Sequence, residues 1–420
     1  MKTDLLLVSR NAFVYAFIFI ALIYSFMYTI QPVFGWYTLN LNPSKILFSF
    51  FITIILALML PIRFSRPSSF FLHLQFFFPI LPMLVMFGVS DFPTVYILMI
   101  IMAFVGIVFF RNLKLKPIFL LSLSPKLFVI GLLAISYFIL FYELTISGKG
   151  FNLDLANIYE FRELNDQSST ASLILYLITF TGSVFLPFAS VISYTQKFWF
   201  LLLLSILGSL LIFGMTNHKS AIFYPFLALA TYLFLETKSP IRNILLSAFA
   251  FIFLSLIVFD ENNFFSVLFT SLGVRRILFE PSLINFFYYD FFSNNPYVYW
   301  SNSRISFGLL DYPYNLDPAH QIGYVYYGSQ LAGANTGWLG SGFMHAGAIG
   351  LFLYSVIIGL LLSYLDSIRT ILPARVIVAL TVSPVFIMFL SSDLFSSLLT
   401  HGVLLSFVLL SFLQLNTKSN

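Results

Sequence analysis

The chain has 420 residues, of which 60% are apolar and only 9% are charged. Soluble domains carry about 25% charged residues, so the composition excludes a water-soluble protein and indicates a polytopic membrane protein. The absence of cysteine excludes disulfides, thiolate metal sites, nucleophilic thiols and lipid attachment through cysteine. The net charge of +5 does not indicate a nucleic-acid partner once the basic residues are assigned to the sides of a membrane.

Apolar stretches long enough to span a bilayer run through most of the chain. A spanning helix needs about 20 mostly apolar residues, because lipid offers no hydrogen-bond partner to the backbone. We expect an all-α bundle of about 12 membrane-spanning helices that forms a single integral membrane domain, residues 1–420. The predicted spans lie near residues 12–30, 44–62, 70–89, 93–110, 125–142, 171–192, 198–214, 220–235, 243–259, 347–365, 375–390 and 398–415.

The basic residues orient this bundle, because lysine and arginine gather in the short cytoplasmic loops of membrane proteins. With a cytoplasmic N-terminus, 14 of the 21 basic residues lie on the inner side, together with 3 of the 16 acidic residues. Both termini are therefore expected in the cytoplasm. The inner residues are Lys2, Arg10, Arg63, Arg66, Arg111, Lys114, Lys116, Lys126, Lys197, Lys238, Arg242, Arg369, Arg375 and Lys418, and the outer ones are Lys45, Lys149, Arg162, Lys219, Arg275, Arg276 and Arg304.

Two outer loops are long, residues 143–170 and residues 260–346. Long loops that keep charged and aromatic residues are usually functional. In the first loop, Leu155, Ile158 and Phe161 have the spacing of a helix lying on the membrane surface. Arg162 would lie beside that stripe, and either an ion pair with a neighbouring acid or a ligand role fits it.

The second loop begins with an apolar run from Phe264 to Phe279, which Glu280–Pro281 is expected to stop. We expect short interfacial helices in this loop. Aromatic residues follow, and they suit a membrane interface or stacking on sugars. The later part is rich in glycine between residues 333 and 350, which allows tight turns and close backbone approach just before the tenth span.

The outer basic residues run against the charge bias of that side. Arginine holds phosphate oxygens bidentately, so a lipid pyrophosphate is the natural partner for those beside apolar sequence. The alternative pairs individual arginines with the 13 outer acids. The candidates for pyrophosphate binding are Arg162, Arg275 and Arg276, followed by Lys219 and Arg304.

Histidines do not have the spacing of a metal site, because none of the five lies three to five residues from another on a helix. We expect no metal and no other cofactor. His73 inside the third span is interpreted as a hydrogen-bonded interior residue, and His401 as a residue of the last bundle helix.

Three segments resemble the O-antigen polymerase (Wzy) family, distant relatives of the O-antigen ligases. They are Arg162 in the smaller loop, Arg275-Arg276-Ile-Leu-Phe-Glu-Pro281 followed by Tyr289-Asp-Phe-Phe292, and Ala334-Asn335-Thr-Gly337 running to Gly347-Ala-Ile-Gly350. The ligases carry a histidine directly before the asparagine of the last motif. This chain has Ala334 there, which favours polymerase over ligase and leaves the general base unassigned.

The resemblance implies a GT-C-like glycosyltransferase of the bacterial inner membrane. Such an enzyme polymerises undecaprenyl-pyrophosphate-linked repeat units into O-antigen or a related surface polysaccharide on the periplasmic face. Its partners are the lipid-linked donor and acceptor and membrane lipid, with a chain-length regulator protein as a candidate and no nucleic acid. Candidates for taking the acceptor proton are Glu280, Asp290, His320 and His345, and Tyr289 and Asn335 are candidates for binding sugar.

Three other functions compete with polymerisation. A lipid-linked oligosaccharide flippase or other transporter would place ionisable residues inside its spans, which here are nearly free of charge. An O-antigen ligase remains the second alternative. A lipid-phosphate-sugar transferase ranks third, because the first outer loop, residues 31–42, offers no acid as a base.

Overall fold

The fold is that of a computed structural model, which describes residues 2–35, 37–118, 123–146, 151–152, 172–217 and 219–413. For residues 2–9, 146, 172, 219 and 304 it describes the backbone alone. The described part of the chain is helical, and its β-structure is one isolated bridge between Leu123 and Leu413. The predicted all-α fold is therefore confirmed.

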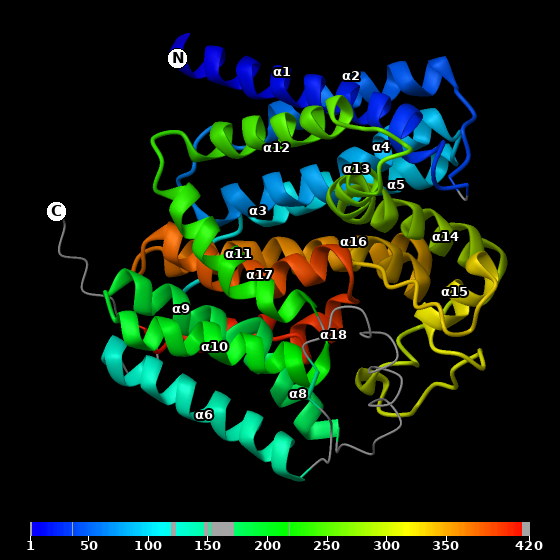
Figure 1. Ribbon diagram of the computed structural model, residues 1–420. Helices are drawn as coiled ribbons and strands as arrows, with labels where there is room; N and C mark the ends of the chain where they lie inside the picture. The colour runs from blue at the N-terminus through cyan, green and yellow to red at the C-terminus, as the bar shows by residue number, and fades with distance from the viewer. Residues whose placement is uncertain are drawn as a thin grey trace. The chain divides into compact units, whose positions relative to one another are not determined.

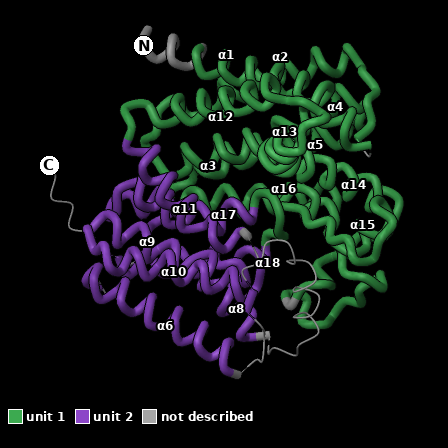
Figure 2. Tube along the Cα trace, viewed as in Figure 1, with its two compact units in different colours: residues 1–114, 237–363, 389–394 green, residues 115–236, 364–388, 395–420 purple. Residues whose placement is uncertain are grey.

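The helices divide between two compact units (Figure 2). The first unit holds residues 1–114, 237–363 and 389–394, and the second holds residues 115–236, 364–388 and 395–420. In chain order the elements are α1 (Lys2–Ser25), η1 (Phe26–Ile30), α2 (Pro43–Met59), α3 (Pro67–Gln75), η2 (Phe76–Ile80), α4 (Leu81–Val89), α5 (Thr94–Phe110), α6 (Pro125–Ile146), α8 (Ser172–Phe180), η3 (Thr181–Phe185), α9 (Leu186–Thr195), α10 (Trp199–Thr216), α11 (Lys219–Leu235), α12 (Pro240–Ile257), α13 (Phe264–Thr270), η4 (Ser271–Phe279), α14 (Glu280–Asn294), η5 (Arg304–Ser306), α15 (Pro318–Tyr327), α16 (Trp338–Ile368), α17 (Ala374–Leu390), α18 (Leu394–Leu399) and α19 (Val403–Leu410).

Each of the twelve predicted apolar stretches coincides with a helix, with helices that follow one another directly or, for the last stretch, with α18 and α19, which residues 400–402 separate. Seven of these are long and apolar enough to cross a membrane, namely Arg10–Ile30, Pro67–Val89, Pro125–Thr145, Leu173–Thr195, Trp199–Thr216, Pro240–Ile257 and Trp338–Ile368. The other five are shorter apolar helices, Pro43–Met59, Thr94–Phe110, Ser220–Leu235, Ala374–Leu390 and Leu394–Leu410. The chain thus has the helices of a membrane protein, and their number as spans stays a prediction.

In the first unit, α1 packs between α2 and α12, and α2 also packs on α4 (Figure 1). His73 of α3 is buried at this core, where its Nδ1 accepts a hydrogen bond from the hydroxyl of Tyr15 over 2.8 Å. Its Nε2 donates to the carbonyl of Pro61 over 2.8 Å. The interpretation of His73 as a hydrogen-bonded interior residue is confirmed.

Prolines accompany all four π-helical segments of the described chain. Proline lacks an N–H group, and its ring collides with the carbonyl four residues earlier, so the wider turn of a π-helix relieves the conflict. Pro79 lies inside η2, and Pro32, Pro187 and Pro281 come just after η1, η3 and η4. The N–H of Glu280 accordingly bonds to the carbonyl of Arg275, five residues back. The predicted stop at Glu280–Pro281 is therefore wrong, because α13, η4 and α14 follow one another as one helical path.

Helix α16 is broken between its first eight residues and the remainder. Ala346 and Gly347 leave the helical region, and Gly347 has a φ of +58° and a ψ of −135°, which only glycine adopts readily. A Cβ on Gly350 would lie 2.0 Å from the carbonyl oxygen of Gly342, so the two parts of the helix touch through backbone alone. The predicted tight turn and close approach are confirmed, and the apolar helix beyond the break matches the predicted tenth span.

The second unit packs α9 against α10, α11 and α6. The hydroxyl of Tyr137 in α6 donates to the carbonyl of Leu204 in α10 over 2.8 Å. His401 lies between α18 and α19 rather than inside a helix, and its carbonyl accepts from the hydroxyl of Ser183 over 3.1 Å. The prediction of His401 within the last helix is therefore wrong by two residues.

Replacement of Gly347 by alanine tests the break in α16. A Cβ there would lie 2.7 Å from the hydroxyl oxygen of Tyr297, in a backbone conformation that costs a non-glycine residue about 1–3 kcal/mol. We expect Gly347→Ala to lower the unfolding midpoint of the detergent-solubilised protein by several degrees. Gly131→Ala in α6 is the control, because nothing lies within 4 Å of its Cβ position. Equal midpoints for the two variants would contradict the analysis.

Candidate functional site

The predicted site residues fall into three groups in the described part of the chain, all within the first unit. Glu280, Arg275 and Arg276 lie where η4 meets α14, His320 and Asn335 lie at α15 and the segment after it, and His345 lies at the break in α16. Arg162 lies outside the described residues, as do the whole 154–166 segment and the side chains of Lys219 and Arg304.

Glu280 collects three donors. Its Oε2 lies 2.8 Å from Nη1 of Arg275 and accepts from the hydroxyl of Tyr37 over 2.6 Å, while Oε1 accepts from the hydroxyl of Tyr327 over 2.7 Å. The Arg275 side chain is only 8% exposed, and its guanidinium stacks over the ring of Phe34. Burial and the Glu280 carboxylate both raise the pKa of Tyr37 and of Tyr327. This cluster holds η4, α14 and α15 together. Arg275 therefore forms an ion pair with an outer acid, which was the predicted alternative to pyrophosphate binding.

Arg276, the next residue, is not part of that cluster. Its side chain is exposed, and it forms no hydrogen bond or ion pair with any described residue. It follows Leu272 by four positions in η4, and Leu272 is exposed on the same helix. Of the five predicted phosphate-binding residues, Arg276 is the one whose side chain is both described and exposed.

Tyr289 and Asp290 lie side by side in sequence on α14 but have different surroundings. Tyr289 is half-buried and stacks on Tyr96 with ring centroids 4.5 Å apart. Asp290 is exposed and accepts from the hydroxyl of Tyr326 over 2.5 Å. Phe287 stacks on Tyr326 at 4.2 Å, so aromatic packing joins α14 to α15 between Asp290 and Glu280.

His320 and Asp317 form a pair at the start of α15. Asp317 is the N-cap, and its Oδ1 accepts from the backbone N–H groups of Ala319 and His320 over 3.1 and 3.3 Å. Its Oδ2 lies 2.5 Å from Nδ1 of His320. An ionised carboxylate only accepts, so Nδ1 carries the hydrogen and the Nε2 lone pair of the 43% exposed imidazole is left as a proton acceptor.

Asn335 lies beside this imidazole, although 14 residues separate them along the chain. A Cβ built on Gly333 would lie 3.9 Å from Nε2 of His320 and 3.8 Å from Nδ2 of Asn335. The neighbours of Asn335 are anchored: Ala334 donates to the carbonyl of Ala319 over 3.0 Å, and the hydroxyl of Thr336 donates to Asn285 of α14 over 3.1 Å. The exposed Asn335 amide is thus held between two fixed residues.

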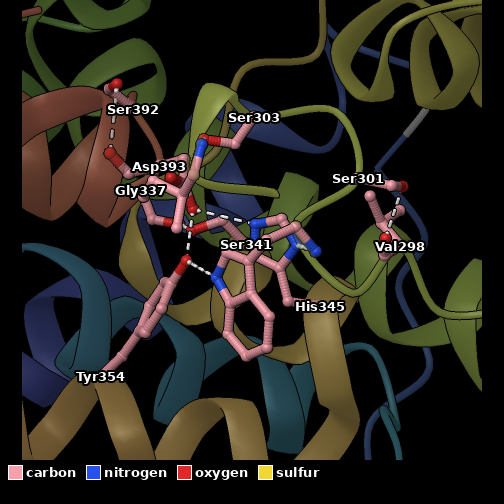
Figure 3. A network of polar contacts seen from close by, with 11 residues as sticks. Val298, Ser301, Ser303, Gly337, Ser341, His345, Tyr354, Ser392 and Asp393 are labelled. Carbon is pink, nitrogen blue, oxygen red and sulfur yellow. Dashed lines mark hydrogen bonds and ion pairs between the residues drawn. The ribbon is translucent and has the colours of Figure 1, made fainter. Parts of the chain in front are cut away.

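His345 belongs to a second histidine–aspartate pair. Its imidazole is buried, Nδ1 accepts from the backbone N–H of Trp300 over 3.0 Å, and Nε2 lies 3.2 Å from Oδ1 of Asp393. The Tyr354 hydroxyl donates to the same oxygen over 2.7 Å and accepts from the indole N–H of Trp300 over 2.9 Å. Figure 3 shows His345 and Tyr354 approaching Asp393 from the two parts of α16. Because both ring nitrogens are engaged, His345 is poorly suited to act as the base.

Tyr288 connects the two pairs. Its buried hydroxyl donates to the carbonyl of Ala334 over 3.1 Å. Burial, followed by the nearby carboxylates of Asp317 and Asp393, raises its pKa. Both carboxylates are therefore close enough to act on one hydroxyl group, and the two pairs belong to one polar region of the first unit.

The described ion pairs agree with the predicted sides of the membrane. Lys45–Asp91, Arg275–Glu280, His320–Asp317 and His345–Asp393 each join two residues assigned to the outer side, and Arg375–Glu236 joins two assigned to the inner side. No group of three or more potential metal ligands occurs among the described residues.

Sequence reasoning missed Asp317, Asp393, Tyr354, Trp300, Tyr37 and Tyr327 as parts of this region. Asp317 had a usable signal, because aspartate followed by proline is a helix N-cap pattern that puts residue 320 within reach. Asp393 lies in a short connection between two apolar helices, outside the two long loops in which the sequence predicts the functional residues.

Comparison of the chain with protein-family models, with curated proteins and with solved structures finds no match. The functional assignment therefore depends on the arrangement of the side chains described above.

The ion pair between Arg275 and Glu280 can be tested by its removal. Glu280→Gln leaves a buried guanidinium without its counter-charge, which should cost about 3 kcal/mol of stability. The double variant Arg275→Met with Glu280→Gln should recover part of that loss, because no buried charge remains. Thermal unfolding in detergent measures both. A Glu280→Gln variant as stable as the wild type would show that this pair does not hold η4 against α14.

Proposed function

We propose that the chain is a GT-C-like glycosyltransferase of the bacterial inner membrane with about 12 spans and its site on the periplasmic side. It joins lipid-pyrophosphate-linked oligosaccharide units into a polysaccharide. The observation that supports this most directly is the meeting of His320, oriented by Asp317, with Asn335 at Gly333. An oriented imidazole beside an amide is suited to binding and deprotonating a sugar hydroxyl.

The reaction transfers a growing glycan to a hydroxyl of an incoming lipid-linked unit. Nε2 of His320 takes the hydroxyl proton as the oxygen forms a bond to the anomeric carbon of the donor. The bond from that carbon to the pyrophosphate breaks, and its electron pair leaves with the pyrophosphate. Arg276 stabilises the departing charge, and Asn335 holds the acceptor sugar. No metal or cofactor is required by this scheme.

His320 replaces the histidine that the ligase motif would have at position 334. Ala334 cannot act as a base, but its backbone N–H donates a hydrogen bond to the carbonyl of Ala319, the residue before His320. The fold thereby brings an imidazole from α15 to the asparagine of the motif. This supports a polymerase with a base of different origin, and it ranks His320 above Glu280, Asp290 and His345.

The first test is reconstitution. The purified full-length chain, mixed with a lipid-linked repeat unit and no nucleotide sugar, should give a ladder of longer products. A lipid moved across a vesicle membrane without lengthening would identify a flippase instead. Transfer of glycan to a lipid A core acceptor without a ladder would identify a ligase.

Substitutions of Arg276 test the pyrophosphate contact. Arg276→Ala should lower the rate of ladder formation by about 10²–10³-fold, the usual loss for one donor to developing charge. Arg276→Lys should restore little, because lysine lacks the bidentate geometry. Arg10→Ala is the control, since Arg10 is also exposed but is assigned to the inner side. An undiminished ladder from Arg276→Ala would exclude this role.

Substitutions of His320 and Asp317 test the base. His320→Gln should slow ladder formation by about 10²–10⁴-fold, the usual contribution of a general base. Asp317→Asn should have a smaller effect and alter the pH dependence of the rate, because the orientation of the imidazole is lost. Asp311→Asn, an exposed aspartate in the same loop, is the matched control. A normal rate and pH profile in both site variants would assign the base elsewhere.

A further inference from the structure

The break in α16 lies against a segment of strained backbone. Tyr299 and Trp300 both have positive φ, +47° and +60°, which is a genuine outlier for bulky aromatic residues. Backbone bonds hold them there: the N–H of Tyr299 donates to the carbonyl of His345 over 3.1 Å, and that of Val298 donates to Met344 over 3.0 Å. Strain that the surroundings maintain at two consecutive residues is a mark of functional sites.

This backbone conformation fixes the hydrogens around Asp393. The backbone N–H of Trp300 can only donate, so Nδ1 of His345 is unprotonated and Nε2–H points to Oδ1 of Asp393. The indole N–H of Trp300 also only donates, so the Tyr354 hydroxyl directs its own hydrogen to the same oxygen. Two donors therefore hold Oδ1 of Asp393 in place.

The side chain of Asp393 is partly exposed at the surface, whereas the side chain of its partner His345 is buried. Its side chain is 15% exposed, against 1% for that of His345. Aromatic side chains lie along the same segment: Tyr299 is 53% exposed, Tyr297 is half-buried, and their ring centroids are 6.0 Å apart. Asp393 is joined to this aromatic segment through the Tyr354 hydroxyl and the indole N–H of Trp300. A carboxylate fixed to a segment with exposed aromatic rings has the chemistry of a carbohydrate site, because sugar hydroxyls donate to the carboxylate and the C–H face of a pyranose packs on an aromatic ring.

The geometry points to a second sugar subsite at the break in α16, in which Asp393 binds pyranose hydroxyls and Tyr299 and Tyr297 form the wall. Trp300 is its positioning residue, acting through His345 and Tyr354. The inference rests on the proposed function in one respect: a polymerase binds two glycans at once, and Asn335 serves the other. The Tyr288 hydroxyl donates to the carbonyl of Ala334, the residue before Asn335.

The test is direct binding of simple sugars to the detergent-solubilised full-length chain. Saturation-transfer NMR with the methyl glycosides of glucose, galactose, N-acetylglucosamine and rhamnose should show binding of at least one by the wild type. Asp393→Asn should weaken that binding by about tenfold or more, as expected for hydrogen bonds to a charged group. Tyr299→Ala, on an exposed side chain, should weaken it without affecting the fold.

Controls separate binding from structure. Asp311→Asn should bind as the wild type does, and Trp300→Phe, which removes only the indole N–H from the network, should bind several-fold more weakly. Thermal unfolding identifies any variant whose fold is lost, and Tyr299→Ala then decides. Absence of sugar binding by the wild type, or unchanged binding by Asp393→Asn and Tyr299→Ala, overturns the subsite.

Failure of this inference and failure of the proposed function give different results. Binding that depends on Asp393, in a protein that makes no ladder, supports the subsite and removes the polymerase. A ladder from a protein whose sugar binding ignores Asp393 and Tyr299 supports the polymerase and removes the subsite.

Discussion

Hydrogen-bond donors that converge on a few carboxylates hold the polar part of the first unit together. A carboxylate that leaves bulk water must regain its lost hydration from protein donors. Glu280 does so with Arg275, Tyr37 and Tyr327, and Asp393 with His345 and Tyr354. The donors come from segments far apart in the sequence, so each carboxylate joins several stretches of chain. The glycine-rich turn and the short helices derive their positions from these bonds.

The same bonds also decide what the neighbouring side chains can do. Asp317 uses both oxygens at the start of α15 and leaves His320 with an accepting Nε2, whereas Trp300 occupies the accepting nitrogen of His345. Two histidine–aspartate pairs of similar composition thus differ in chemistry: in one the imidazole suits proton transfer, and in the other the carboxylate suits ligand binding. Their shared neighbour Tyr288 places both in a single polar region.

Periodicity and apolar content were enough to locate every helix predicted as a span, because a long apolar run has few alternatives to a helix. The continuous helical path through α13, η4 and α14 was not predicted, because Pro281 was interpreted as a helix stop, whereas the π-helical turns of η4 carry the helix past it. Among the site residues, His320 was predicted from the sequence as a candidate base and Asn335 as a candidate for binding sugar. Their proximity depends on the bond between Ala319 and Ala334, a contact between two segments that sequence spacing alone does not predict.

The adjacent residues Arg275 and Arg276 have opposite surroundings in the π-helical segment η4. Arg275 turns inward to Glu280, while Arg276 is exposed, and the nine residues of Ser271–Phe279 contain more residues per turn than an α-helix would. Loss of a single residue from this segment would tighten it toward α-helical winding and rotate everything that follows. Glu280, Tyr288 and Asp290 would then face new directions together, so the direction in which each side chain of α14 points is set by the winding of η4 before it.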